Sequence, residues 1–204
     1  MTTVAESVIE QLPDHVANQI AAGEVVQRPA SVVKELMENA LDAGARKLVV
    51  ELKDAGRNRI VVTDNGSGMG AADAEACFGR HATSKLRSAD DLLSLATMGF
   101  RGEALSSVAS IARVELRTRR EGDATGTEVV MEGGELMGAE PVTCDPGTRM
   151  TVKRLFYNVP ARRNFLKSDQ VELRHCIDEF QRICLLYTSP SPRDQRGSRM
   201  PSSA

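Results

Sequence analysis

The sequence predicts an α+β fold, a two-layer sandwich in which helices lie on one face of a mixed, mostly antiparallel sheet. Two segments near the N-terminus have the 3.6-residue period of amphipathic helices. Residues 47–52 and 59–63 are predicted strands separated by a polar turn at 54–58, which indicates an antiparallel hairpin. Further strands are expected near residues 111–119, 126–132 and 148–155, and the helices do not alternate with them as single crossovers.

The N-terminal helices are bounded by recognisable breaking and capping residues. The first is predicted over residues 16–27, and Arg28-Pro29-Ala30 ends it. Ser31 is then expected to cap a second helix by accepting a backbone hydrogen bond. That helix is predicted to run to about Ala43, where Gly44 permits a left-handed stop.

The remaining elements are predicted in the same way. A glycine-bearing loop at 64–70 precedes a short helix from Ala71 to Phe78. Residues 79–102 are polar with interspersed glycines, and a loop of this length inside a domain is usually functional. Helix resumes over 103–109, and Ser168 is expected to cap a last helix from Asp169 to about Ile183.

Composition favours one soluble domain. The chain has 204 residues, 41% of them hydrophobic, and a net charge of −2, so any contact with nucleic acid must come from a local patch. No apolar run is long enough to cross a membrane, and Met1–Glu10 lacks the basic region of a secretory signal. We therefore expect a cytoplasmic protein with no membrane partner. The cysteines show no CxxC spacing, so free thiols rather than a zinc site are predicted.

The segment from Cys184 to Ala204 departs from this pattern. A natural disordered tail is one explanation for its Ser, Pro and Arg content. However, CLLYTSPSPRD and SRMPSSA resemble two parts of one translated frame of sequencing-adapter DNA, at the right separation. We therefore expect residues 1–183 to form a C-terminally incomplete domain and residues 184–204 to be a disordered, non-native tail.

Four polar constellations could carry chemistry. The first is Glu35 with Asn39, which lie four residues apart and so share one flank of the second helix. Taken alone, such a pair more often marks a solvated helix face. The second is Asp64-x-Gly66-x-Gly68 directly after a strand, where Asp64 could accept a hydrogen bond from an amine and the glycines allow close approach. An ordinary Asn-Gly turn explains this motif as well.

The third constellation is a pair of glycine-bearing segments, Gly79–Lys85 and Gly99–Leu105. Gly102 precedes a helix start, where free backbone N–H groups favour an anion. The two segments suit a lid over a polyphosphate, although a surface loop remains the alternative. The sequence contains no Walker loop.

The fourth constellation is the basic segment Lys153–Lys167. It holds five basic residues, three aromatic residues and no acid. It could contact DNA phosphates. A loop with its aromatic side chains in the core is an equally good explanation.

Together and in this order, these segments resemble MutL DNA mismatch-repair proteins of the GHKL group. That group also includes type II topoisomerase ATPase subunits, heat-shock chaperones and histidine kinases. The resemblance spans residues 13–167, and the last two of its blocks are expected in these forms only in the MutL branch. The blocks are NQIAAGEVVQRPASVVKELMENALDAGA at 18–45, TDNGSGM, GRHATSK, GFRGEAL and FYNVPARRNFL.

The resemblance implies an ATP-binding sandwich of the GHKL type with Mg²⁺ as its metal. Glu35 would be the general base, Asn39 would bind ATP and give its side-chain oxygen to Mg²⁺, and Asp64 would bind the adenine amine. Gly66 and Gly68 would open space for the base, and Thr148, in a Gly-Thr element, would support Asp64. Arg162 and Arg163 would contact DNA. The phosphate lid would comprise His81, Ala82, Thr83, Ser84, Lys85, Gly99, Phe100, Arg101 and Gly102.

At the level of the protein, the resemblance implies an ATPase that couples its ATP state to dimer closure and partner signalling. Partners would be a mismatch-recognition protein, downstream repair factors, non-specifically bound DNA and a second subunit, identical or different. The family's second domain, with a lysine that reaches the γ-phosphate, and its C-terminal domain would lie beyond this chain. A histidine kinase and a nucleotide-regulated binding module are the competing hypotheses. Few residues precede Glu35 to hold a phosphoacceptor helix, which weighs against the kinase.

Overall fold

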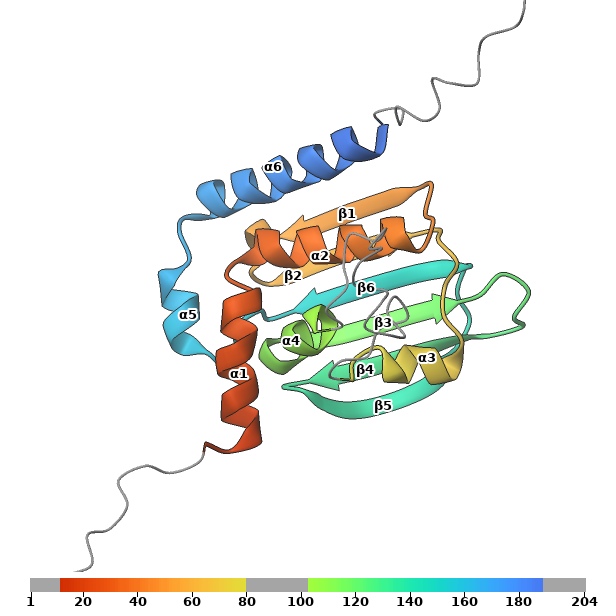
Figure 1. The fold of residues 1–204 in the computed structure, drawn as a ribbon, viewed down its shortest axis with the longest axis horizontal. Helices are drawn as coiled ribbons and strands as arrows, with labels where there is room; N and C mark the ends of the chain where they lie inside the picture. Colours follow the sequence, from red (N-terminus) through yellow and green to blue (C-terminus); the bar gives the residue numbers. More distant parts are fainter. Residues whose placement is uncertain (1–11, 80–102, 189–204) are drawn as a thin grey trace, which may run out of the picture.

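Within the described residues, six strands form one antiparallel sheet in the order β1-β2-β6-β3-β4-β5 (Figure 1). The computed structural model describes residues 12–79 and 103–188. All neighbouring strands pair antiparallel, and the predicted hairpin is the β1–β2 pair. The strands are β1 Leu48–Lys53, β2 Arg59–Asp64, β3 Arg113–Arg119, β4 Gly126–Glu132, β5 Glu135–Val142 and β6 Gly147–Lys153.

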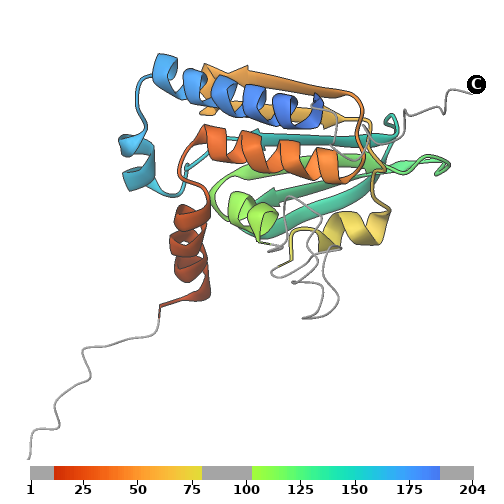
Figure 2. The ribbon, with the colours of Figure 1, turned by 45° about the horizontal axis from the view of Figure 1, so that its top comes forward.

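Helices cover one face of this sheet, as the two ribbon views show (Figures 1 and 2). α2 lies on β1 and β2, and α4 lies on β3 and β4. α6 packs against α2, and α1 packs against α4. The predicted two-layer sandwich is confirmed. The helices are α1 Asp14–Val25, α2 Pro29–Asp42, the 3-10 turn η1 Asp54–Gly56, α3 Ala71–Ala76, α4 Ala104–Ile111, α5 Pro160–Phe165 and α6 Asp169–Thr188.

The core lies between the sheet and α2, α4 and α6. On β3, every second side chain points toward the helices and is buried, as the period of a half-buried strand requires, and Met150 and Val152 of β6 are buried in the same way. The apolar stripe of α2 meets this layer and includes Val33 and Met37, which are 0% and 1% exposed. Phe156, at 0% exposure, closes the core beyond β6. Each such side chain contributes about 1.5–3 kcal/mol of hydrophobic stabilisation.

The start of α2 differs from the prediction. Ser31 does not cap this helix, because the helix already begins at Pro29 with Arg28 extended in front of it. Proline fits the first helical position because its fixed φ is helical and its missing N–H has no partner to lose there. The other end is as predicted, with Gly44 at a φ of 74° after the last turn. The first helix also begins and ends two residues earlier than the predicted 16–27.

Two elements were not predicted. β5 is an edge strand whose side chains are almost all exposed, so its sequence shows no alternation. It also contains Gly138 and Pro141, and proline is tolerated in a sheet only at such an edge. α5 buries none of its residues, so no helical period marks it, although Pro160 stands at its first position.

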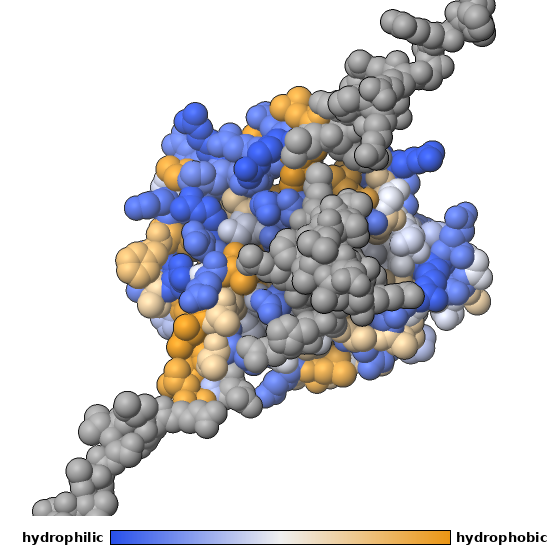
Figure 3. Space-filling model, viewed as in Figure 1, coloured by the Kyte–Doolittle hydropathy of each residue, from blue (hydrophilic) through white to orange (hydrophobic). Residues whose placement is uncertain are grey.

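The last helix is longer than predicted. α6 continues to Thr188, so the residues of the expected tail that the structure describes, Cys184–Thr188, are helical rather than disordered. Ile183 is buried and Cys184 packs against the core, which extends the helix past the predicted end. Pro190 follows shortly, and a proline disfavours helix in the residue before it. The surface over α6 is largely hydrophilic (Figure 3). The adapter-like origin of this segment stays a prediction.

The start of α6 depends on a buried carboxylate. Glu172 is 1% exposed, and its Oε1 accepts a hydrogen bond of 2.9 Å from the backbone N–H of Lys167. We expect Glu172→Ala to lower the free energy of unfolding by about 1–3 kcal/mol, because the hydrogen bond to the Lys167 N–H and the packing of a buried side chain are both lost. Asp178→Ala, at an exposed position of the same helix, is the control. Equal chemical-denaturation midpoints for the two variants would contradict this role of Glu172.

Candidate functional site

Glu35 and Asn39 share one partly buried flank of α2, beside its apolar stripe. The Glu35 side chain is 25% exposed, and Lys34 Nζ lies 3.4 Å from its carboxylate and 3.2 Å from that of Glu38. Burial alone would lower the pKa of Lys34, but the charges of Glu35 and Glu38 outweigh it and raise the pKa. This flank therefore carries carboxylate and amide oxygens of the kind that suit a hard cation such as Mg²⁺.

The loop after β2 is fastened to the C-terminal end of α2. The backbone N–H of Ser67 donates to the carbonyl of Ala43 at 2.9 Å, and the Ala43 N–H donates to the carbonyl of Asn39 at 3.0 Å. The Asn65 side chain accepts hydrogen bonds from the backbone N–H groups of Arg46 (2.9 Å) and Lys47 (2.7 Å). These contacts place Asp64 beside the turn of α2 that follows Asn39.

Asp64 is the last residue of β2 and pairs with Thr148 on the central strand β6. Its carboxylate accepts a 2.8 Å hydrogen bond from the Gly66 N–H and another from the backbone N–H of Thr148. Burial raises the pKa of Asp64, and these two hydrogen bonds oppose the rise. Thr148 thus lies next to Asp64, and its support of Asp64 in binding a base stays a prediction. The arrangement leaves the Asp64 carboxylate as a fixed, half-buried hydrogen-bond acceptor at the C-terminal end of β2.

Thr118 on β3 was not among the predicted site residues. It is 0% exposed, and its Oγ1 accepts a hydrogen bond of 2.9 Å from the Met69 N–H. The same oxygen lies 3.0 Å from the Gly147 carbonyl and 3.1 Å from Thr148 Oγ1. Thr118 thus ties the loop after β2 to the start of β6. A threonine inside a strand carries no sequence signal for such a role.

Two glycines of this region allow backbones to pass at close range. Gly68 has a φ of 62°, and a Cβ there would overlap the carbonyl of Arg119. A Cβ on Gly66 would meet Ala43 at 2.9 Å. Both glycines therefore let the loop lie against its neighbours. That Gly66 and Gly68 open space for a base stays a prediction.

The predicted phosphate lid lies outside the described residues. This holds for all of its members, namely His81, Ala82, Thr83, Ser84, Lys85, Gly99, Phe100, Arg101 and Gly102. Their proposed role stays a prediction.

An open hollow of about 430 Å³ between α3 and β4–β5, lined in part by Met69, Glu75 and Thr127, neighbours the loop after β2.

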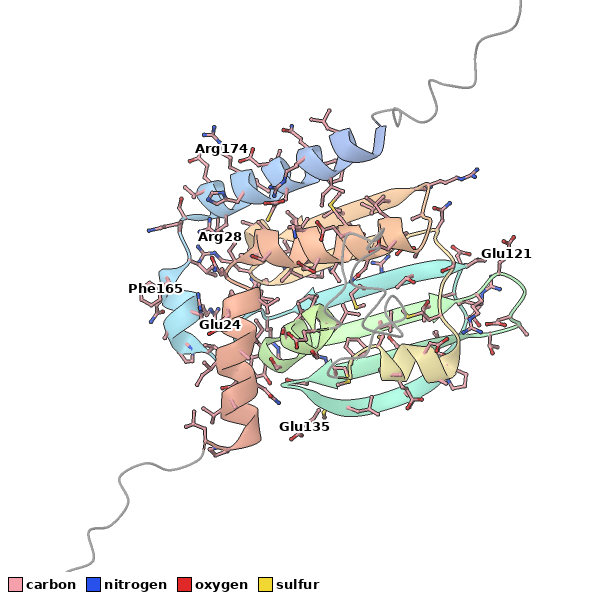
Figure 4. The ribbon with its side chains drawn as sticks, in the orientation of Figure 1. Glu24, Arg28, Glu121, Glu135, Phe165 and Arg174 are labelled. Atoms are coloured by element: carbon pink, nitrogen blue, oxygen red, sulfur yellow. The ribbon has the colours of Figure 1, made fainter. Side chains whose placement is uncertain are left out.

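The basic segment is divided between the core and the surface. Phe156 is buried, whereas Phe165 is 79% exposed and points outward from α5 (Figure 4). Arg162 donates a 2.5 Å hydrogen bond to the Gly23 carbonyl, so it connects α5 to α1. Arg163 is exposed. The observed contact of Arg162 is thus structural, and DNA contact by Arg162 and Arg163 stays a prediction.

In the described part of the chain, no group of three or more His, Cys, Asp or Glu side chains is arranged to hold a metal ion. No helix there has the length and apolarity needed to cross a membrane. Burial raises the pKa of Cys77 to about 12 and that of Cys176 to about 11. Both thiols therefore stay protonated at neutral pH and are poor nucleophiles.

The raised pKa of Asp64 predicts a pH dependence. As the pH falls from neutral into the acidic range, Asp64 gains a proton and becomes a poorer acceptor for a ligand amine. We therefore expect the affinity for an adenine nucleotide to decrease as the pH is lowered. Because the folded pKa lies above the unfolded value, protonation of Asp64 favours the folded state, so unfolding through this group does not cause the loss. Nucleotide titrations at several pH values, with circular dichroism at each, would test this, and an affinity independent of pH would contradict it.

Comparison with known families identifies one match over more than half of the chain. Residues 27–140 match the family described as Histidine kinase-, DNA gyrase B-, and HSP90-like ATPase. The chain is 60% identical over 181 residues to the DNA mismatch repair protein MutL of Flavobacterium johnsoniae, covering 89% of this chain and 28% of that protein. It is 58% identical over 179 residues to that of Parabacteroides distasonis, covering 88% and 29%. The chain thus spans less than a third of the length of these relatives.

Solved structures show the same fold. The Aquifex aeolicus MutL ATPase domain complexed with ADP aligns with a TM-score of 0.60 at 33% identity, over 79% of this chain and 56% of that one. The N-terminal domain of a DNA repair protein aligns with a TM-score of 0.67 at 28% identity, over 81% and 47%.

Proposed function

Because the chain belongs to the histidine kinase-, DNA gyrase B- and HSP90-like ATPase family, as a MutL-type ATPase domain, we propose that it binds ATP with Mg²⁺ and hydrolyses it. The observation that carries the proposal is the position of Asp64, a half-buried acceptor held by two backbone hydrogen bonds beside the end of α2. The Aquifex aeolicus domain, which shares this fold, was solved with ADP.

In this proposal, each site residue has a distinct task. Asp64 accepts a hydrogen bond from the adenine amine, and Thr148 supports it through its backbone N–H. Glu35 orients the attacking water and takes its proton, because phosphoryl transfer needs a positioned nucleophile more than a covalent intermediate. Asn39 gives its side-chain oxygen to Mg²⁺, which neutralises phosphate charge when bound. The segments around His81 and Gly102 close over the phosphates.

For the whole protein, we propose a role in DNA mismatch repair, the function named for its relatives. There the ATP state would drive dimer closure and signal to a mismatch-recognition protein and to downstream repair factors. Non-specific binding to DNA and a cytoplasmic location belong to the same proposal. Because the chain spans 28% of the Flavobacterium johnsoniae relative, these roles require residues outside it.

The test is binding of a non-hydrolysable ATP analogue with Mg²⁺ to the chain and to Asp64→Asn. The substitution replaces an ionised acceptor with an amide, and we expect affinity to fall about 100-fold, because a buried charged hydrogen bond is lost. Asp73→Asn, at an exposed aspartate of α3, is the matched control and should bind like the wild type. Circular dichroism would check the fold of each variant. Equal affinities for the wild type and Asp64→Asn would refute the adenine pocket.

A further inference from the structure

Three polar side chains stand in one cross-strand row at the end of the sheet. The strand register places Asp64 of β2 opposite Thr148 of β6, and Thr148 opposite Thr118 of β3. Directly paired residues of neighbouring strands project to the same face, so all three side chains lie on the helix-covered face. Asp64 is half-buried and Thr118 fully buried, so the row runs from the candidate base pocket into the core.

The hydrogen bonds of Thr118 can be assigned by counting protons. Its Oγ1 makes three contacts: the Met69 N–H at 2.9 Å, the Gly147 carbonyl at 3.0 Å and Thr148 Oγ1 at 3.1 Å. A hydroxyl has one proton and two acceptor lone pairs, whereas a carbonyl only accepts and an amide N–H only donates. The Met69 N–H therefore donates to Thr118, and the Thr118 proton goes to Gly147.

The contact between Thr118 Oγ1 and Thr148 Oγ1 then remains, and only the hydroxyl proton of Thr148 is available for it. Because the Thr118 proton is used on the Gly147 carbonyl, the Thr148 hydroxyl must donate to Thr118. All three contacts are satisfied in this arrangement. The opposite choice leaves the carbonyl contact at Gly147 without a proton in a buried environment, which is costly.

We propose that Thr118 is a specificity-positioning residue: it takes the proton of Thr148, so that Thr148 and Asp64 together present only hydrogen-bond acceptors to the nucleotide base. Thr118 itself touches no ligand and acts through Thr148. This inference rests on the proposed adenine pocket and deepens it. These acceptors of Asp64 and Thr148 favour a base that carries an amine at C6, such as adenine, and disfavour a base that carries a carbonyl there.

The contacts of this row also keep the hydroxyl proton of Thr148 directed at Thr118. Asp64 is held by the N–H groups of Gly66 and Thr148, both of which donate. Within the described residues, Thr118 Oγ1 is the only hydrogen-bond partner of Thr148 Oγ1. Removing the Thr118 hydroxyl would free the Thr148 proton to rotate toward a ligand carbonyl. Thr118 therefore controls the direction of a hydrogen bond that it does not itself make to the ligand.

The experiment compares ATP with inosine triphosphate, which has a carbonyl in place of the C6 amine. Dissociation constants with Mg²⁺ are measured for the 204-residue chain, Thr118→Val and Thr118→Ser. We expect the wild type and Thr118→Ser to prefer ATP, and the preference to fall about tenfold in Thr118→Val, as one hydrogen bond changes direction. General damage to the pocket would weaken both nucleotides alike and leave their ratio unchanged.

The outcomes separate this inference from the proposed function. If the folded wild type binds neither nucleotide, or Asp64→Asn binds like the wild type, the adenine pocket itself is wrong. If the wild type prefers ATP and folded Thr118→Val keeps the full preference, the pocket stands and the role of Thr118 is overturned.

A second variant decides the direction even if Thr118→Val fails to fold. Thr148→Val removes the hydroxyl at the ligand side and leaves Thr118 intact. If Thr148 accepts from the base, this variant weakens ATP about fivefold to tenfold and does not weaken inosine triphosphate. Weaker binding of inosine triphosphate, or no change for either nucleotide, would overturn the inference.

Discussion

Replacing Glu35 with alanine is expected to lower the rate of ATP hydrolysis by about 10²–10⁴-fold, the usual contribution of a positioned general base. The affinity for a non-hydrolysable ATP analogue with Mg²⁺ should stay within about twofold, because a base that acts on water contributes mainly in the transition state. Single-turnover hydrolysis and equilibrium binding, measured on the same preparation, would separate the two effects.

Glu38 provides the matched control for this substitution. It lies on the same flank of α2 and shares Lys34 with Glu35, at 3.2 Å compared with 3.4 Å. Glu38→Ala therefore disturbs the same ion pairs without removing the proposed base. If both variants lose hydrolysis equally, the effect belongs to Lys34 rather than to a base. If hydrolysis by Glu35→Ala equals that of the wild type, the domain acts as a nucleotide-regulated binding module or uses another base.

The second large effect is expected at Gly147, where β6 begins. Its φ is 115°, and a Cβ would overlap the Asp64 carbonyl and lie 2.9 Å from the Cα of Asn65. Both neighbours are backbone, so no side-chain rotation relieves the clash. We expect Gly147→Ala to lower the free energy of unfolding by about 3–5 kcal/mol, at the upper end of single substitutions. It should also weaken nucleotide binding, because Asp64 has to move.

Gly122→Ala is the control for this substitution. Gly122 has a comparable φ of 95°, but nothing lies within 4 Å of the Cβ position. That substitution adds only backbone strain, of about 1–3 kcal/mol. Denaturant midpoints for the two variants should therefore differ. Equal losses of stability would show that strain alone, and not the contact with Asp64, makes Gly147 necessary.

Local patterns predicted the elements that bury one face. The 3.6-residue period of α2 is visible in the sequence because its inner side chains face a core, and the polar turn between β1 and β2 marks their hairpin. β5 and α5 escaped prediction for the opposite reason, since neither buries a continuous stripe. Residue type alone predicts a cap at Ser31, but Pro29 already supplies a helical φ and starts α2 two residues earlier.

Some residues of the candidate site could likewise be predicted from local sequence, and others could not. Glu35 and Asn39 could be paired from their spacing on one helix, and Asp64 from its place directly after a strand. Thr118 could not be found, because its role depends on the register between β3 and β6 and on a loop residue 49 positions away. A threonine that alternates correctly within a strand gives no sign of which residue it will face across the sheet.

The position of β6 has a consequence for how the protein is made. Among the described residues, β6 is the last strand in sequence, but it lies inside the sheet, between the β1–β2 hairpin and the β3–β5 meander. Until β6 leaves the ribosome, the nascent chain holds two separate pieces of sheet, and Asp64 lacks the Thr148 backbone N–H that helps to hold its carboxylate. Joining them closes long loops, which is the slow step in folding sheets of non-local topology. The proposed adenine pocket is therefore incomplete until β6 inserts, and any stabilisation of the domain by bound ATP can begin only then.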